Sequence, residues 1–179
     1  MRAVLDANVL FPTILREILI DLARAGLYTP LWSPRILAEW RHAAARLGTD
    51  QDAVAGAEIA LLRNRFPAAE VPDDGHRAID LHFPDPADRH VVEAALAGQA
   101  TLIVTANLRD FPQRLMAGLG LRALHPDAFL LDLLKDHPAA VRAAVQAARG
   151  KAAAMGGGMT AHEMLKRCRL PRLARACKG

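Results

Sequence analysis

The chain begins with a short apolar segment that ends in an acidic residue, and this order constrains the fold more than any other feature. Residues 1–5 are too few for a surface helix but suit a buried parallel strand. Asp6 follows at once, and a helical pattern begins after Pro12. Because open α/β sheets place their sites beyond the carboxyl ends of the strands, Asp6 is a candidate site residue. A helix cap is the alternative role for this side chain.

Short apolar segments alternate with amphipathic segments along the rest of the chain. Strands are predicted at residues 27–32, 78–83, 101–104 and 121–124. Helices are predicted at residues 34–47, 52–66, 89–97 and 138–151, and after Pro12, Pro112 and Pro126. Because parallel strands are usually joined by helices, the alternation predicts an α/β fold, with a mostly parallel sheet and helices on both of its faces.

The composition narrows the class of protein further. A chain of 179 residues suits one domain, or one domain with an appendage, and 52% apolar with 4% aromatic residues favours helices around aliphatic cores. No apolar stretch approaches the roughly 20 residues of a membrane span, and residues 1–20 lack the pattern of a signal peptide. Cys168 and Cys177 are the only cysteines, and their spacing fits neither a redox motif nor a zinc site. We therefore expect a cytoplasmic protein with no membrane segment.

The charge is divided unevenly between the body of the chain and its end. Residues 1–149 carry 16 Lys and Arg against 18 Asp and Glu, whereas residues 150–179 carry seven against a single Glu. We expect a domain over residues 1–150, followed over residues 151–179 by a glycine hinge at 156–158 and a short basic helix. The pattern from Thr160 to Glu163 is a capping box that begins this helix.

The basic tail suits a polyanionic substrate, because it supplies cations beside an acidic body. The candidate phosphate contacts in the tail are Arg167, Arg169, Arg172 and Arg175. Arg89 and Arg109 lie beside acidic residues of the body and are two further candidates. A solvated helical face is the alternative role for the tail.

Acidic side chains at element boundaries form the candidate site. Asp6 ends the first strand, Glu39 lies within the second helix, and Asp88 opens the helix before the strongest strand. Asn107 or Asp110 follows that strand. Oxygen ligands from separate segments, with no His or Cys among them, suit Mg²⁺ or Mn²⁺. Such an ion can activate a water and stabilise the leaving oxygen of a phosphodiester. Taken singly, each acid could instead be a cap or a solvated charge.

Four motifs, in this order, resemble those of the PIN-domain ribonucleases. They are V-L-D-A-N-V-L at 4–10, I-L-A-E-W at 36–40, D-P-A-D-R-H-V-V-E-A-A-L at 85–96 and L-I-V-T-A-N-L-R-D-F-P at 102–112. The resemblance covers residues 1–124 and implies a three-layer α/β/α sandwich that cleaves single-stranded RNA with Mg²⁺ or Mn²⁺. It implies three core acids, Asp6, Glu39 and Asp88, with Asn8 and Thr105 as the polar residues that support them.

One position departs from the pattern of the family. Many members have Asp where this chain has Asn107, and Asp110 is the residue that could replace the missing charge. The T-x-N-L-x-D-F variant resembles that of one branch of the family. Many relatives are toxins of toxin–antitoxin pairs, so the resemblance also implies an antitoxin protein as a partner, and it leaves a homodimer open.

Two other functions remain open at this point. A phosphatase with an aspartyl nucleophile also places Asp after its first strand, but typically as D-x-D, whereas Asn8 stands two residues after Asp6 here. The other alternative is a catalytically weak module that binds RNA or a protein partner. Since aromatic residues are few, RNA binding would depend mainly on phosphate contacts.

Overall fold

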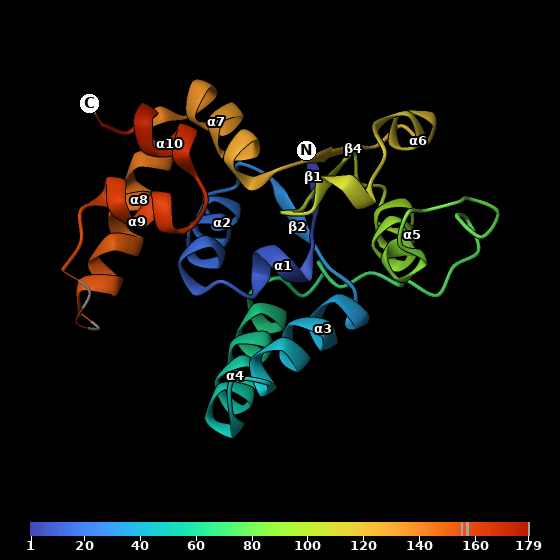
Figure 1. Cartoon of the computed structure of the whole chain (residues 1–179), viewed down its shortest axis with the longest axis horizontal. Coiled ribbons are helices and arrows are strands. Elements are labelled where there is room, and N and C mark those ends of the chain that lie inside the picture. The colour runs from blue at the N-terminus through green and yellow to red at the C-terminus, as the bar shows by residue number, and fades with distance from the viewer. Residues whose placement is uncertain (155, 157, 179) are drawn as a thin grey trace. The chain divides into compact units, whose positions relative to one another are not determined.

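The computed structural model describes residues 1–154, 156 and 158–178 (Figure 1). These residues form two compact units, each assembled from two stretches of the chain. Unit 1 comprises Met1–Phe11 and Tyr28–Leu124, and unit 2 comprises Pro12–Leu27 and His125–Gly179. Unit 1 holds the whole sheet and unit 2 is helical. Within the described ranges, no helix is both long and apolar enough to cross a membrane.

The sheet of unit 1 is parallel throughout and has the strand order β2-β1-β3-β4. Its strands are β1 (Arg2–Leu5), β2 (Thr29–Leu31), β3 (Leu102–Val104) and β4 (Arg122–Leu124). The apolar residues of β1 and β3 are buried, as expected for central parallel strands. The chain proceeds from β1 to β2 on one side and continues with β3 on the other. The carboxyl ends of β1 and β3 therefore flank a switch point, where open sheets place their sites.

Helices flank this sheet within unit 1. They are α1 (Ala7–Leu10), α3 (Pro34–Ala45), α4 (Thr49–Arg65), α5 (Arg89–Ala97) and α6 (Gln113–Gly118), with 3-10 turns η1 (Pro86–Asp88) and η2 (Leu108–Asp110). Helix α5 packs on β1 and β3, and α3 packs on α1 and α4. Ser33 Oγ caps α3 by accepting from the Ile36 amide at 3.2 Å, and Asp85 caps η1. The predicted parallel α/β fold is confirmed.

The predicted strand at residues 78–83 is wrong. The segment is irregular because buried Glu93 of α5 takes the hydrogen bonds that a strand would need: its carboxylate accepts from the amides of Arg77 at 3.2 Å and Ala78 at 2.6 Å. The backbone passes so close to Glu93 that a Cβ on Gly75 would lie 2.7 Å from the carboxylate. Glu93 thereby fixes the segment that leads to η1.

Unit 2 is built from five helices in the part of the chain that the structure describes. They are α2 (Thr13–Arg24), α7 (Pro126–Asp136), α8 (Pro138–Ala154), α9 (Ala161–Arg167) and α10 (Pro171–Ala176). Helix α8 packs on α2, α7 and α9, and α10 packs on α7 and α9. The capping box of α9 is present, with the Thr160 hydroxyl accepting from the Glu163 amide and the Glu163 carboxylate accepting from the Thr160 amide.

The basic tail forms two helices, where the sequence predicted one. The chain turns after α9 because Arg169 has a left-handed backbone, with φ of +59°, and Pro171 cannot continue a helix. Of the predicted glycine hinge, residue 157 lies outside the described residues, as does the neighbouring residue 155. The division of the chain at residue 150 stays a prediction.

Candidate active site

Asp6 lies at the carboxyl end of β1, buried against the end of β3. Its backbone amide donates to the Val104 carbonyl at 3.1 Å, which extends the pairing of the two strands. The Asp6 Oδ2 atom accepts from Asn8 Nδ2 at 2.6 Å and from Thr105 Oγ1 at 2.7 Å. Although Asp6 occupies the N-cap position of α1, its side chain makes no capping hydrogen bond. Its carboxylate is therefore held for a role other than a helix cap.

Asn8 and Thr105 connect the two strand ends through a closed set of hydrogen bonds. Asn8 Nδ2 also donates to Thr105 Oγ1 at 3.1 Å, and Asn8 Oδ1 accepts from the Ala106 amide at 2.9 Å. The Thr105 hydroxyl accepts in turn from the Asn107 amide at 3.1 Å. The Thr105 hydroxyl gives its one proton to Asp6 Oδ2, so both side-chain donors of the trio meet the same carboxylate oxygen. This network orients Asp6.

Asp88 and Asp110 form the second part of the site. Asp88 ends η1, and Asp110 ends η2, where it accepts from the side-chain amide of Asn107. Burial, followed by the charges of Asp6, Asp110 and Asp85, raises the pKa of Asp88 to about 6, and a hydrogen bond with Asp110 contributes. Burial is also the main cause that raises the pKa of Asp6, and the Thr105 hydrogen bond opposes it. Burial and the negative charges of the neighbouring carboxylates together disfavour ionisation of Asp88.

Glu39 belongs to the same electrostatic neighbourhood but has its own cations. Its Oε1 atom lies 3.0 Å from Nε2 of buried His90 and 3.3 Å from Nε of Arg35. Burial opposes ionisation of Glu39, but His90 and Arg35 outweigh it and hold the pKa of this carboxyl below its ordinary value. The His90 contact is poorly aligned for a hydrogen bond, since neither ring nitrogen has a hydrogen-bond partner in the described structure. The close approach of His90 nevertheless contributes to the lowered pKa of Glu39.

His90 and Arg35 are site neighbours that the sequence did not single out. Arg35 also donates to the carbonyl of Ala87 at 3.2 Å, so it connects α3 to the turn that ends in Asp88. Its position four residues before Glu39 on a helix was a signal that could have identified it. His90 directly follows the D-P-A-D-R motif, but no spacing in the sequence shows that it faces Glu39.

The predicted site residues are neighbours without forming a closed metal cage. The charge of Glu39 contributes to the raised pKa of Asp6, and the charges of Asp6 and Asp110 contribute to the raised pKa of Asp88. However, within the described part of the chain no three His, Cys, Asp or Glu side chains are arranged as a metal-binding group. The chemistry of the donors fits a hard divalent cation, because their ligand atoms are carboxylate oxygens and a cation would offset their mutual repulsion. The convergence of Asp6, Glu39 and Asp88 around one ion therefore stays a prediction.

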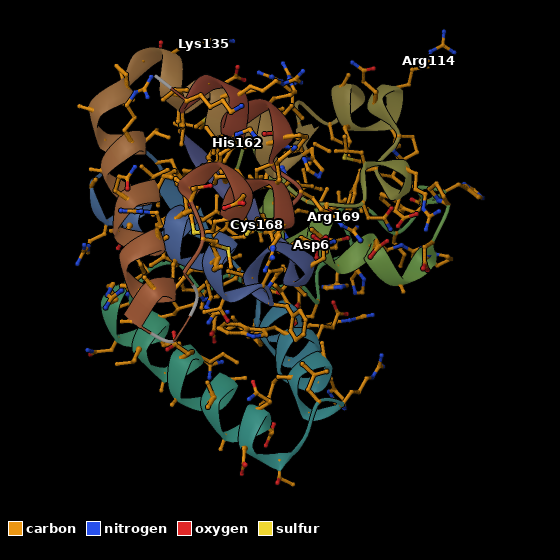
Figure 2. All side chains as sticks on the ribbon, turned by 60° about the vertical axis from the view of Figure 1, so that its left-hand side comes forward. Asp6, Arg114, Lys135, His162, Cys168 and Arg169 are labelled. Carbon is orange, nitrogen blue, oxygen red and sulfur yellow. The ribbon has the colours of Figure 1, made fainter. Side chains whose placement is uncertain are left out.

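The candidate phosphate-binding arginines fall into two groups. Arg109 is exposed in η2, with its Nε 4.0 Å from Asp110, while Arg89 has a buried Nε without a hydrogen-bond partner in the described structure. The tail arginines are all exposed and belong to unit 2: Arg167, Arg169, Arg172 and Arg175. Figure 2 labels Asp6 of unit 1 and Arg169 of unit 2.

Comparisons with known proteins agree with the arrangement of unit 1. A family model described as "PIN domain" matches residues 2–109. A protein of Mycobacterium tuberculosis (strain ATCC 25618 / H37Rv), named "Putative ribonuclease VapC50", is 45% identical over 68 residues. The match covers 38% of this chain and 38% of that relative, so the chain spans well under half of the relative's length. No solved structure gives a significant match.

Proposed function

This chain belongs to the PIN domain family, and on that basis we propose that it is an endoribonuclease that hydrolyses phosphodiester bonds of single-stranded RNA with Mg²⁺ or Mn²⁺. The observation that carries the proposal is the group of carboxylates at the carboxyl edge of the sheet, where burial and the charges of neighbouring carboxylates raise the pKa of Asp88 to about 6. Acids that repel one another in a folded protein are typical of a functional site that receives a cation.

Asp6, Asp88 and Glu39 are the residues that would hold the ion, with Asp110 and Asn107 beside them. The bound ion would supply an activated water and neutralise charge on the phosphate. Asn8 and Thr105 keep the Asp6 oxygens in one orientation, since both donate to the same oxygen atom. Arg35 connects Glu39 to the turn that ends in Asp88, because it donates hydrogen bonds to the Glu39 carboxylate and to the Ala87 carbonyl. Exposed Arg109 would contact a neighbouring phosphate of the RNA.

The resemblance of the T-x-N-L-x-D-F segment to one branch of the family supports a narrower proposal, that the nuclease is the toxin of a toxin–antitoxin pair. The partner would then be a small antitoxin protein. The name of the matched relative supports ribonuclease activity. A cytoplasmic location and a homodimer stay predictions. Membership of the PIN domain family leaves the phosphatase alternative without support.

A catalytically weak binding module is the second candidate. It is favoured by the neutral Asn107 and by the lack of a three-residue metal-binding group among the described residues. The two candidates differ in one measurable property, because only the nuclease converts RNA into shorter products in the presence of a divalent ion.

The test incubates the purified full chain with end-labelled single-stranded RNA in Mn²⁺, Mg²⁺ or EDTA and resolves the products on a denaturing gel. We expect cleavage with Mn²⁺ or Mg²⁺ and none with EDTA. Asp6→Asn should lower the rate by about a thousandfold, since several kcal/mol of transition-state stabilisation depend on the ion. Asp74→Asn, an exposed acid of unit 1, is the matched control and should cleave normally. Equal cleavage by the Asp6 and Asp74 variants would contradict the assignment of Asp6.

A further inference from the structure

The exposed side of the basic tail carries Lys and Arg side chains that form no ion pair among the described residues. We call this set the tail surface: Lys166, Arg167, Arg169, Arg172, Arg175 and Lys178. All six side chains are exposed, and in the described part of the chain none of them lies within ion-pair distance of a carboxylate. The single acid of the tail, Glu163, is engaged in the capping box of α9. The tail surface therefore has a high density of positive charge, with Glu163 as the single acid of the tail near it.

The opposite side of the two helices is packed into unit 2. Met164 and Leu165 of α9, and Leu170 and Leu173 at α10, are fully buried. Helix α10 packs on α7 and α9, and α9 packs on α8. These contacts give the tail a fixed structure, although each helix is too short to be stable alone.

Asp127 attaches the tail to α7 through its buried carboxylate. Its Oδ2 atom accepts from the Arg172 amide at 3.0 Å and its Oδ1 from the Leu173 amide at 2.9 Å, so it satisfies two free amides in the first turn of α10. Arg142 donates to the Ala176 carbonyl at 3.2 Å, which holds the other end of α10. Both hydrogen bonds of Asp127 use only the backbone. The side chain of Arg172 therefore remains available for a ligand.

From these contacts we infer that the tail surface is a preformed binding site for the phosphodiester backbone of single-stranded RNA, with Asp127 as its positioning residue. The inference rests on the proposed function for the choice of RNA as ligand. Cations on a fixed backbone are suited to consecutive phosphates, because the backbone of the tail does not have to become ordered when the strand binds. Figure 2 labels Arg169 and Cys168, which lie between α9 and α10.

An anionic membrane is the other large polyanion to consider, and the structure disfavours it. A helix that binds a membrane surface inserts exposed apolar side chains. The large apolar residues exposed in the described structure are Met1, Leu47, Val54, Leu61, Ile79 and Leu108, and all lie in unit 1. The apolar residues of the tail are instead buried. The tail surface thus offers charge without an inserting face.

The principal experiment measures binding of fluorescein-labelled oligouridylate to the full chain by anisotropy, in EDTA, between about 50 and 200 mM KCl. Arg169→Ala with Arg172→Ala removes two cations and leaves the backbone amides that bind Asp127. We expect affinity to fall by roughly tenfold at the lower salt concentration, and the slope of log affinity against log salt to decrease by about 1.4. The matched control, Arg46→Ala with Arg65→Ala, changes the net charge equally in unit 1 and should bind like the wild type. Equal losses in both double variants, or none in the tail variant, would overturn the inference.

Asp127→Asn tests the positioning role, because an amide nitrogen cannot accept a hydrogen bond from a backbone amide. We expect a smaller loss of affinity, about threefold, and faster hydrogen exchange in residues 171–176. In the Arg169→Ala, Arg172→Ala, Arg175→Ala background the same substitution should have little further effect on affinity, since contacts that act together are not additive. A full additional loss in that background would show that Asp127 acts elsewhere and would contradict its role.

Two controls separate this inference from other outcomes. Phosphatidylglycerol vesicles should bind far more weakly than RNA, and stronger binding to vesicles, lost in the tail variant, would overturn the choice of RNA. Cleavage is measured separately with Mn²⁺. A wild-type chain that binds RNA through the tail arginines but never cleaves it would refute the proposed nuclease and leave the tail surface intact.

Discussion

The acidic site of unit 1 and the anchor of the basic tail in unit 2 use the same chemical group in opposite ways. Asp127 is buried, but two backbone amides donate to its carboxylate. Asp88 is partly buried, and this burial, together with the charges of Asp6, Asp110 and Asp85, raises its pKa to about 6. A buried carboxylate therefore stabilises the fold where amides meet it and opposes the fold where other carboxylates meet it. The second arrangement persists where function requires it.

The largest expected effect of four is at Thr105, whose hydroxyl joins the two strand ends. Thr105→Val keeps the shape of the side chain but leaves Asp6, Asn8 and the Asn107 amide short of a partner. We expect the free energy of unfolding to fall by about 2 kcal/mol, measured by urea denaturation, and RNA cleavage to fall by about tenfold to a hundredfold. Thr105→Ser retains the hydroxyl and should recover most of both. A stable and active valine variant would show that the network does not orient Asp6.

Asn107→Asp adds a carboxylate to the site and should increase the repulsion between carboxylates there, which the buried Asp127 of unit 2 does not experience. The new charge faces Asp110, with which Asn107 now forms a hydrogen bond. We expect Mn²⁺ affinity by calorimetry to rise by about tenfold, equivalent to about 1.4 kcal/mol, and the melting temperature without metal to fall. Asp110→Ala should weaken Mn²⁺ binding. Unchanged Mn²⁺ affinity in both variants would mean that neither side chain approaches the ion.

Asp88→Asn should stabilise the metal-free protein, and only above a defined pH. The pKa of Asp88 is about 6 in the folded protein and near 3.8 in the unfolded chain. Its ionisation therefore has no effect on stability below pH 4, opposes folding increasingly as the pH rises from 4 to 6, and opposes it fully above pH 6. The shift corresponds to about 3 kcal/mol, of which solvent screening leaves about 1 kcal/mol for this partly exposed group. Urea denaturation in EDTA at several pH values should show the variant gaining stability over wild type as the pH rises. A constant difference would contradict the repulsion.

The smallest effect should come from Glu163 in the tail, and its sign should be opposite. Hydrogen bonds from the backbone and side chain of Thr160 lower the pKa of Glu163. The lowered pKa means that Glu163 stabilises α9 above its unfolded pKa of 4.5, and that this stabilisation is lost as the pH falls through its folded pKa. Glu163→Gln should increase hydrogen exchange in α9 at neutral pH and leave it unchanged in acid. An effect of the substitution on hydrogen exchange that is the same at both pH values would show that the charge of Glu163 does not stabilise α9.

The sequence predicted the parts of unit 1 that depend on local pattern. Strands β1 and β3 are apolar runs that end in polar residues, so their position and the parallel α/β fold were accessible from periodicity and motif order. The roles of Asp6, Glu39 and Asp88 stay predictions. The spacing of Arg35 and Glu39 on one helix was readable from the sequence. The contact of Glu39 with His90 joins α3 to α5, and no spacing in the chain encodes a contact between separate helices.

Other differences arise where local signals compete. Four residues of α1 are too few to show helical periodicity. Residues 78–83 alternate weakly like a strand, but the amide of Ala78 is bound by Glu93, which lies 15 residues further along the chain. In the tail, Pro171 was visible in the sequence and was a sufficient reason to expect a break between two helices.

Glu93 has a consequence for how unit 1 moves. Opening of the segment before η1 would leave a buried carboxylate without the amides of Arg77 and Ala78, at a cost of several kcal/mol. The segment therefore does not behave as an independent flap, although it contains no regular secondary structure. Because these hydrogen bonds connect the segment to α5, we expect a protease that needs an unfolded loop to cleave it more slowly than a free loop.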